Sequence, residues 1–457
     1  MNVIFFSTNS NFYNSNSIQI KSLPKCKTEW LGFAKNHKNH NFTIILQKPG
    51  MFLLDFEDLK SEKSELCIAE NLKFYFIDEN DFSNEKIASL ILIFSPDIVC
   101  PITYWISPFD WLSIKDSLIC ELLNQKNIKT VNHPSISNLI CFDKTKTHEF
   151  LEKNNFKCAK ALPVHYQMFF SERNKHEIKE NVYKEFIFQK MNELKFPVVV
   201  KDTLGLSSYG MDVCKTYAEA KHVLLSKKNN GDRLIEEFIS GLSFGAEIYG
   251  TDGDYIVSPL FINSLNQFGL TSPKQNVKLG PVKNKKFNLD FLQNELIRLA
   301  RLLNFSGIAQ VDLIFANGTW YIIEINSRLS GMTQTIAASL NLSLYELIFM
   351  ATADFKNSKE RLENLIENAK LTFNLKFPLL TEENLVKMSK YDFISFVNQI
   401  ENHEAKQLRE LGYAEVIFGN ADSKQELQEK LEILNKDFSS EMESRFYQNS
   451  LNLLAEI

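Results

Sequence analysis

The sequence contains little glycine and proline, 16 and 12 among 457 residues, and it has no internal repeat and no low-complexity linker. A disordered chain is therefore excluded, because hydrophobic residues make up 44% of the composition and charged residues only 23%. At roughly 150 residues per domain, the length predicts about three domains, each able to bury its own core.

Paired cysteine motifs, long apolar runs and an excess of positive charge are also missing. The seven cysteines are widely spaced and form no C-x-x-C, which favours reduced thiols over disulfides or structural zinc. No apolar run approaches the 18 or so residues of a membrane span, and the first residues lack a basic segment. A net charge of -5 would not attract nucleic acid or an anionic membrane. We expect a soluble cytoplasmic protein with small-molecule partners.

The pattern along the chain predicts α/β and α+β units in three domains, at 1–135, 136–355 and 356–457. The first alternates short apolar runs with polar or helical stretches, as in a Rossmann-like layer, but it contains no G-x-G-x-x-G, which disfavours a dinucleotide site. In the second, helical patterns (143–153, 177–192) precede strands (198–201, 212–215, 233–239, 244–249, 255–262), an amphipathic helix (288–304) and a hairpin (308–315, 320–325). The third predicts strands at 370–377 and 413–418 and helices at 391–399 and 424–435.

The hairpin carries the strongest chemical signal, Q-V-D-L-I-F-A-N-G-T-W-Y-I-I-E-I-N-S-R. It brings together Asp312, Glu324, Asn326 and Arg328, and carboxylate and amide oxygens are the ligands that magnesium prefers. The alternative is an ordinary amphipathic hairpin whose acids face solvent, which we would favour if the hairpin stood alone.

The turn of the hairpin decides whether these side chains meet. A two-residue Asn317-Gly318 turn would place Asp312 opposite Ile323 and send Glu324 to the other face. A three-residue loop, 316–318, with Gly318 left-handed as a bulge, pairs 315 with 319 and puts Asp312, Glu324 and Asn326 on one face. We predict the longer loop.

Two weaker signals precede the hairpin. Lys201 ends the apolar run F-P-V-V-V-K, and a loop with two glycines and two serines follows (Gly205, Ser207, Ser208, Gly210), which could lay amides and hydroxyls over phosphates. The adjacent Glu236 and Glu237 point to opposite faces of a strand, so one could face a ligand. The alternatives are a plain hairpin turn, a solvated lysine and acids that decorate a sheet edge.

In order, Asp143-Lys144, V-V-V-K, the Gly/Ser loop, E-E-F-I-S-G, and V-D-L followed twelve residues later by E-I-N-S-R resemble the ATP-grasp superfamily over residues 136–355. The resemblance implies a nucleotide-binding domain of two α+β halves, between a Rossmann-like domain and a small C-terminal α/β domain. It also implies that the enzyme is a ligase that uses ATP with magnesium.

The resemblance further implies a role for each matching residue. Lys144 and Lys201 would contact the α and β phosphates, under a lid formed by Gly205, Ser207, Ser208 and Gly210. The adenine would be held by Glu236, the Glu237 carbonyl and the Ile239 amide. Two magnesium ions, which manganese could replace, would bind to Asp312, Glu324 and Asn326. Arg328 would stabilise the acyl phosphate and the tetrahedral intermediate.

One departure concerns the ribose, because Ser243 stands where the family often has an acid, and Glu247 is a speculative substitute. Lysines in the segment that follows could face a phosphate or the acceptor pocket, or could simply be solvated (Lys274, Lys278, Lys283). Nothing in the sequence places the histidines at the predicted site, and we interpret them as structural or surface residues (His133, His148, His165).

The function implied is activation of a carboxylate as an acyl phosphate and its ligation to an amine, with release of ADP and phosphate. The expected partners are therefore a small carboxylate and an amine, and the resemblance leaves room for a homodimer. The alternatives are a carboxylase that works through carboxyphosphate and a nucleotide-binding module without catalysis. No biotinyl-carrier segment supports the former, and the retained hairpin residues argue against the latter.

Overall fold

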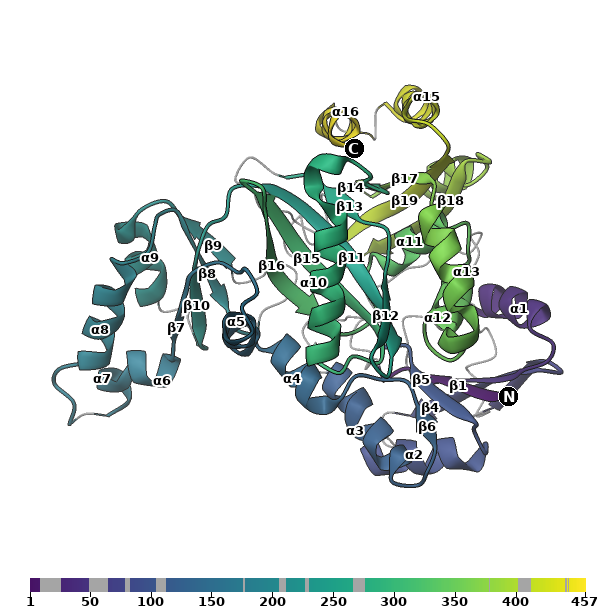
Figure 1. Cartoon of the computed structure of the whole chain (residues 1–457), viewed down its shortest axis with the longest axis horizontal. Helices are drawn as coiled ribbons and strands as arrows, with labels where there is room; N and C mark the ends of the chain where they lie inside the picture. Colours follow the sequence, from purple (N-terminus) through teal and green to yellow (C-terminus); the bar gives the residue numbers. More distant parts are fainter. Residues whose placement is uncertain are drawn as a thin grey trace.

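The computed structural model of the chain describes residues 1–8, 26–48, 65–78, 83–103, 112–175, 177–204, 211–226, 230–265, 276–377, 379–401, 412–439, 442 and 444–457. Three sheets organise these residues, and helices cover them (Figure 1). Within the described ranges, no helix is both long and apolar enough to cross a membrane.

The N-terminal sheet is mainly parallel and has helices on both faces, as in a Rossmann-like layer. Its strand order is β3 (Glu65–Ala69), β4 (Leu72–Asp78), β2 (Asn41–Lys48), β1 (Asn2–Phe6), β5 (Ile98–Pro101) and β6 (Lys129–Thr130). Alternate residues of β1 face opposite sides. Val3 and Phe5 pack with α1 (Cys26–Asn36), whereas Ile4 and Phe6 pack with α2 (Asn84–Ile93) and α3 (Leu112–Asn124).

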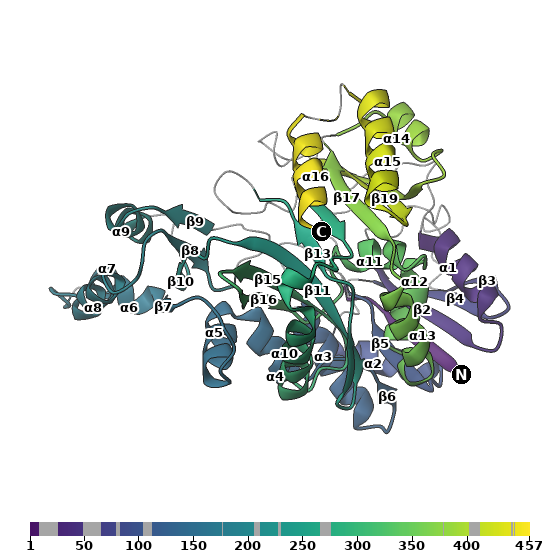
Figure 2. The same ribbon diagram turned by 45° about the horizontal axis from the view of Figure 1, so that its top comes forward.

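A small antiparallel sheet lies at one end of the molecule (Figures 1 and 2). Two helices, α4 (Ser135–Phe142) and α5 (Lys144–Lys153), lead to it from the N-terminal layer. Its strand order is β7 (Ala161–Val164), β10 (Arg233–Glu237), β8 (Val198–Asp202) and β9 (Met211–Cys214). Its helices are α6 (Tyr166–Phe169), α7 (Ser171–Asn174), α8 (Val182–Met191) and α9 (Tyr217–Leu225). Together they form a separate apolar core.

The large sheet occupies the middle of the molecule. Its strand order is β16 (Thr319–Asn326), β15 (Gly307–Ala316), β11 (Leu242–Thr251), β13 (Phe261–Asn263), β14 (Val277–Gly280), β17 (Leu371–Phe377), β19 (Gly412–Ala421) and β18 (Ile394–Glu401), and β12 (Asp254–Val257) pairs with β11. Its helices are α10 (Leu289–Leu302), α11 (Thr333–Ser339), α12 (Leu344–Ala351), α13 (Phe355–Glu367), α14 (Glu382–Met388), α15 (Lys424–Asp437) and α16 (Ser444–Glu456). Trp30 of α1 stacks on Tyr345 of α12, which joins the N-terminal layer to this part.

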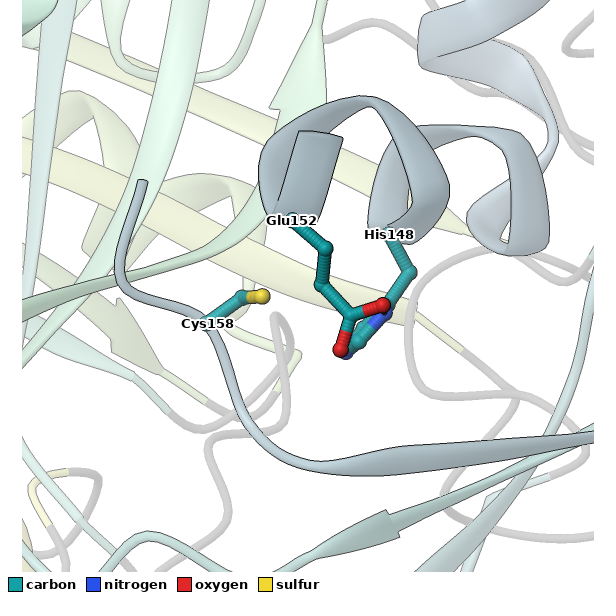
Figure 3. Close-up of side chains that lie close together, drawn as sticks. All are labelled: His148, Glu152 and Cys158. Carbon is teal, nitrogen blue, oxygen red and sulfur yellow. Dashed lines mark ion pairs between the residues drawn. The ribbon is translucent and has the colours of Figure 1, made fainter. Parts of the chain in front are cut away.

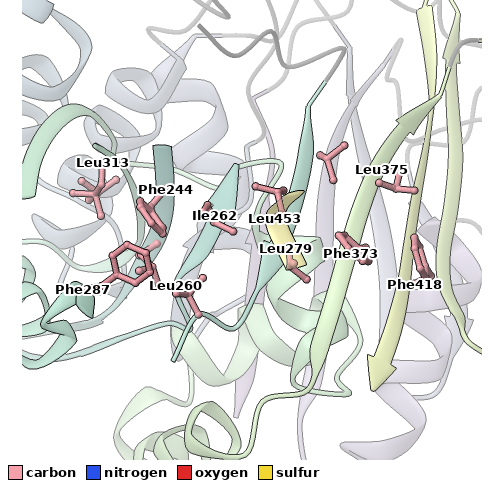
Figure 4. Close-up of a cluster of buried hydrophobic side chains, with 14 of the residues drawn as sticks. Phe244, Leu260, Ile262, Leu279, Phe287, Leu313, Phe373, Leu375, Phe418 and Leu453 are labelled. Carbon is pink, nitrogen blue, oxygen red and sulfur yellow. The ribbon is translucent and has the colours of Figure 1, made fainter. Parts of the chain in front are cut away.

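One face of the large sheet carries an apolar row that crosses six neighbouring strands. In the strand register the partners follow one another from β15 to β19: Leu313, Phe244, Ile262, Leu279, Phe373 and Phe418. Figure 4 shows these side chains in line, with Phe287, Leu260 and Leu453 packed against them. Because side chains alternate along a strand, the residues between them point to the opposite face. One strand register therefore decides which residues of this sheet form the core and which form the polar face.

The predicted division at residues 135 and 355 stays a prediction, but one expected element is wrong. Residues 391–399 were expected to be helical, whereas the structure has strand β18 there, paired with β19. The segment is rich in aromatic and β-branched residues, and pairing at the sheet edge outweighs a helical spacing of its apolar positions. Strand β17 hydrogen-bonds to β14, so the C-terminal strands extend the large sheet.

The apolar row predicts a measurable loss of stability when a central ring is removed. Phe244 is fully buried, so Phe244→Ala should cost about 3 to 5 kcal/mol of unfolding free energy, visible as a lower urea midpoint. Phe291→Ala is the matched control, because that ring on α10 is 51% exposed and its removal should cost far less. Equal losses for the two variants would contradict the assignment of the core.

Candidate functional site

The turn of the β15–β16 hairpin has two residues. Ala316 pairs with Thr319, and Asn317 and Gly318 both have positive φ, 50° and 75°. This is the left-handed conformation that a two-residue hairpin turn needs and that Asn and Gly adopt readily. The predicted three-residue loop is therefore wrong.

A β-bulge nevertheless brings the acids together. Leu313 pairs with Ile322, but Asp312 pairs with Glu324, so Ile323 is an extra residue on β16. One added residue reverses the face of everything beyond it. The bulge thus returns Glu324 and Asn326 to the face of Asp312, where they were expected for a different reason.

Hydrogen bonds hold the acidic end of the hairpin in one arrangement. Gln310 Nε2 donates to Asp312 Oδ1 at 2.7 Å, and Asn326 Nδ2 donates to Gln310 Oε1 at 2.7 Å. Arg328 Nη1 donates to Asn326 Oδ1 at 2.8 Å, which leaves that oxygen a second lone pair. Sequence reasoning missed Gln310, although its position two residues before Asp312 places it on the same face.

The two acids respond differently to their surroundings. Burial, and then the charge of Glu324, raise the pKa of Asp312 to about 6. Burial also acts to raise the pKa of Glu324, but Lys144, Lys201 and Arg328 outweigh it and hold that pKa below its ordinary value. Two partly buried carboxylates on paired positions, with an amide oxygen beside them, are a donor set that fits a divalent cation. Such an ion would relieve the repulsion that raises the pKa of Asp312.

Lys144 and Lys201 reach this end of the hairpin from different elements. Asp143 caps α5 by accepting from the Thr145 amide at 2.9 Å, which places Lys144 at the start of the helix. Lys144 Nζ lies 3.1 Å from Glu324 Oε1. Lys201, on β8, is buried and its Nζ lies 2.6 Å from Glu236 Oε2 on β10. Both lysines thus have carboxylate partners in the free protein.

The remaining predicted nucleotide contacts lie along β10 and the segment after it. The carboxylate of Glu236 forms an ion pair with Lys201. The Glu237 amide donates to the Lys160 carbonyl, and its Oε1 accepts from the Lys195 amide. Ile239 follows the strand and is partly exposed. The predicted lid residues lie outside the described residues: Gly205, Ser207, Ser208 and Gly210.

Glu247 is a poor candidate for a ribose contact. It is fully buried, and its carboxylate accepts hydrogen bonds from Ser330, Thr333 and Tyr249. Burial raises its pKa to about 7 against these donors. The Ser243 hydroxyl accepts from the Asn263 amide at 3.3 Å. Both side chains therefore belong to a hydrogen-bonded network on the polar face of the sheet.

The three loop lysines and the three histidines differ in where they lie and in what they contact. Lys278 lies on β14 and is partly buried, Lys283 is exposed and donates to the Glu367 carbonyl, and Lys274 lies outside the described residues. His133 is structural, as predicted: Nδ1 accepts from the Ser306 amide and Nε2 donates to the Ile308 carbonyl. Burial lowers its pKa to about 4. His165 is an exposed neighbour of Asp232.

Three side chains near Lys144 form a cluster that resembles a metal site, His148, Glu152 and Cys158 (Figure 3). Their potential ligand atoms lie within 4.8 Å of one another. However, His148 Nε2 donates to the Ala159 carbonyl. Burial, followed by Glu152 and Glu236, raises the pKa of Cys158 to about 12, so the thiol keeps its proton. Zinc binds cysteine as the thiolate, so Cys158 would have to lose its proton before it could join His148 and Glu152 as a ligand.

A small cavity of about 30 Å³ lies between the hairpin end and the N-terminal layer, and Arg328, His133 and Asp116 line it. Asp116 is 4% exposed and accepts from Thr8 Oγ1 at 2.6 Å. Burial raises its pKa to about 7 despite the hydrogen bonds from Thr8 and Thr103. A buried carboxyl group without a cation partner prefers its neutral form.

Comparison with known proteins places this geometry in a known class. Residues 158–343 match the family model described as D-ala D-ala ligase C-terminus. A D-alanine--D-alanine ligase of Thermotoga petrophila is 25% identical over 235 residues, which are 48% of this chain and 67% of that protein. An L-amino acid ligase from Bacillus licheniformis has a TM-score of 0.61 at 15% identity and covers 96% of this chain and 97% of its own. A Hydrogenobacter thermophilus biotin carboxylase domain has a TM-score of 0.59 at 13% identity, with coverages of 96% and 90%.

The fold and the matched family model together define an ATP-grasp protein. Residues 158–343 carry the match to the D-ala D-ala ligase family, so this part of the chain is an ATP-grasp domain of the carboxylate-amine ligase type, as its residues predict. The chain is an ATP-dependent ligase that forms carbon-nitrogen bonds, and enzymes of this class use ATP with a divalent metal.

The raised pKa of Asp116 predicts a pH dependence of stability. Its folded pKa of about 7 exceeds the ordinary value of 3.8, so between these values the folded state holds a proton that the unfolded state has lost. The resulting stabilisation is complete below pH 3.8 and is lost as the pH rises through 7. Asp116→Asn should therefore raise the melting temperature relative to wild type more at about pH 8 than at about pH 5. Calorimetry with Asp392→Asn, an exposed control, tests this, and an equal difference at both pH values would contradict it.

Proposed function

We propose that Asp312, Glu324 and Asn326 hold two magnesium ions, and that Lys144 and Lys201 hold the α and β phosphates of ATP. The observation that carries this proposal is the convergence of three oxygen-bearing side chains on one face of the hairpin, with Lys144 Nζ 3.1 Å from Glu324. Bound magnesium would neutralise negative charge on the phosphoryl group during transfer. Manganese could serve in the same donor set.

The chain's own residues orient the two reactants. A carboxylate oxygen of the acid attacks the γ-phosphorus and displaces ADP, which gives an acyl phosphate. Arg328, which donates to Asn326 Oδ1 and lines the cavity below the hairpin, is placed to contact that acyl group. The amine then attacks the carbonyl carbon and expels phosphate, and the guanidinium stabilises the negative oxygen that forms. No covalent enzyme intermediate is needed.

Amino acids are the first substrates to test. The similar proteins are named as ligases of D-alanine and of L-amino acids, so both reacting groups would come from such compounds. On the nucleotide side, we propose that Glu236, the Glu237 carbonyl and the Ile239 amide hold the adenine. Incoming phosphates would then compete with Glu236 for Lys201, since these two are paired in the free protein. A homodimer in the cytoplasm remains the expected assembly and location.

Loss of a metal ligand should abolish turnover without unfolding the protein. Asp312→Asn and Glu324→Gln should each lower kcat by about 100-fold or more, because each replaces a carboxylate that would hold the metal ion, and that ion would neutralise charge on the transferred phosphoryl group. Phosphate release with ATP and a panel of paired amino acids measures this. Glu360→Gln, an exposed acid on α13, is the control and should keep full activity.

The same assay tests the reaction type. Phosphate release that requires both an acid and an amine supports ligation. Release that instead depends on bicarbonate, or full activity of both hairpin variants, would contradict the proposal.

Lys201→Met should weaken ATP binding more than chemistry. The substitution removes the buried cation and leaves Glu236 unpaired beside the phosphates, so KM for ATP should rise about 10-fold or more. Lys195→Met changes an exposed lysine just before the same strand and should leave KM for ATP unchanged. Equal KM values for the two variants would remove Lys201 from the phosphate site.

A further inference from the structure

The polar face of the large sheet carries a row of side chains opposite the apolar row. In the strand register, Ser243 pairs with Asn263, Asn263 with Lys278, and Lys278 with Asn374. These residues lie on the same face as Asp312, because Asp312 pairs with Gly245, two residues from Ser243. The row therefore begins beside the hairpin acids and runs toward the C-terminal strands.

Lys278 stands out in this row because it has no fixed partner. In the part of the chain that the structure describes, no ion pair and no side-chain hydrogen bond joins the Lys278 ammonium group to another residue. Its neighbour Lys376, by contrast, lies 2.5 Å from Glu415, and both of these side chains are largely buried. The row thus holds two ammonium groups for one paired carboxylate. Lys278 remains partly exposed, so solutes can reach it.

A second unsatisfied group lies next to Lys278. Asn374, its strand partner on β17, is fully buried and donates through Nδ2 to Thr335 and Glu415. Its Oδ1 is buried and has no hydrogen-bond partner. Most buried polar atoms in proteins are paired, so this oxygen calls for a hydrogen-bond donor such as water or an ammonium or hydroxyl group of a ligand, whereas the Lys278 ammonium group beside it calls for an anion.

The position of Lys278 distinguishes it from the phosphate lysines. Lys144 approaches the hairpin at β16, the edge nearest the small sheet, whereas Lys278 lies on β14, beyond β11 and β13. Three strand spacings separate β14 from β15, ~14 Å across the sheet. Lys278 and Asp312 are still close enough that each charge shifts the pKa of the other. A substrate that reacts at the hairpin from the side away from ATP would extend toward Lys278.

We propose that Lys278 is a specificity-determining residue that binds a negatively charged group of the acid or amine substrate, distinct from the carboxylate that is phosphorylated. The chemistry is that of a carboxylate or a phosphate group. The proposal rests on the proposed function, since it assigns one end of a substrate whose other end reacts at Arg328 and the hairpin.

Matched pairs of compounds test which substrate carries the charge. L-alanine with L-alaninamide, and D-alanine with D-alaninamide, vary the charge of the amine substrate. L-aspartate with L-asparagine, and O-phospho-L-serine with L-serine, vary a carboxylate and a phosphate on the acid. Lys278→Met should raise KM for the charged member of at least one pair by about 10- to 100-fold and leave its neutral partner nearly unchanged. Lys278→Arg, which keeps the charge, should retain most of the preference.

Two controls separate recognition from a structural role. Lys283→Met removes an exposed lysine five residues along the same segment and should change no KM. The melting temperature of Lys278→Met should not fall, because the change removes a partly buried cation beside Lys376. Lys278→Gln tests the same two quantities, KM and the melting temperature, with a polar and uncharged side chain in place of lysine.

The outcomes are distinguishable from failure of the proposed function. If wild type releases phosphate but Lys278→Met affects charged and neutral members equally, the assignment of Lys278 is wrong. If no pair turns over in wild type, ligation of these compounds is wrong. The thermal shifts given by L-aspartate and O-phospho-L-serine then still decide the assignment. Shifts lost in Lys278→Met but kept in Lys283→Met support it, and shifts equal in both variants overturn it.

Discussion

The repulsion between two partly buried carboxylates is the interaction on which the site depends. Asp312 and Glu324 lie on paired positions of one hairpin, where water cannot fully screen their charges. Lys144 contacts Glu324 directly, and its charge, with those of Lys201 and Arg328, keeps Glu324 ionised. Asp312 lacks such a contact and keeps its raised pKa. Nearby cations thus compensate the charge of Glu324, whereas Asp312 has less positive charge around it, as expected of a site that binds a cation.

The two faces of the large sheet explain how so many charges lie beside a large core. Along each strand, alternate residues form the apolar row from Leu313 to Phe418, and the residues between them form the polar face from Asp312 to Glu415. A shift of one residue exchanges the two sets. The bulge at Ile323 makes that exchange on β16. Ile322 therefore packs in the core while Glu324 and Asn326 face the site. Register shifts also occur between β17 and β19 and between β18 and β19, at the other edge of the sheet.

The sequence predicted that three hairpin side chains share one face, but for the wrong reason. The spacing of Asp312, Glu324 and Asn326 was tied to a three-residue loop, but Asn317-Gly318 forms the two-residue turn its composition favours, and the bulge at Ile323 corrects the register. A bulge leaves little trace in sequence, since any residue can occupy it. The segment 391–399 was mistaken for a helix because its strand partner β19 lies some twenty residues later. Gln310 was overlooked because an amide next to a stronger signal looks like a neutral strand residue.

The two sides of the proposed site differ in how their charged side chains are paired. On the nucleotide side, the cations Lys144, Lys201 and Arg328 face the anions Asp312, Glu324 and Glu236, so the free protein carries little excess charge there. If phosphates displace Glu236 from Lys201, as we propose, they would need positive charge to arrive with them, which a metal-nucleotide complex would supply. At Lys278, by contrast, no described carboxylate has to be displaced. In these proposals, a bound nucleotide would replace Glu236 as the partner of Lys201. A substrate bound at β14 would instead give Lys278 a partner without displacing a carboxylate.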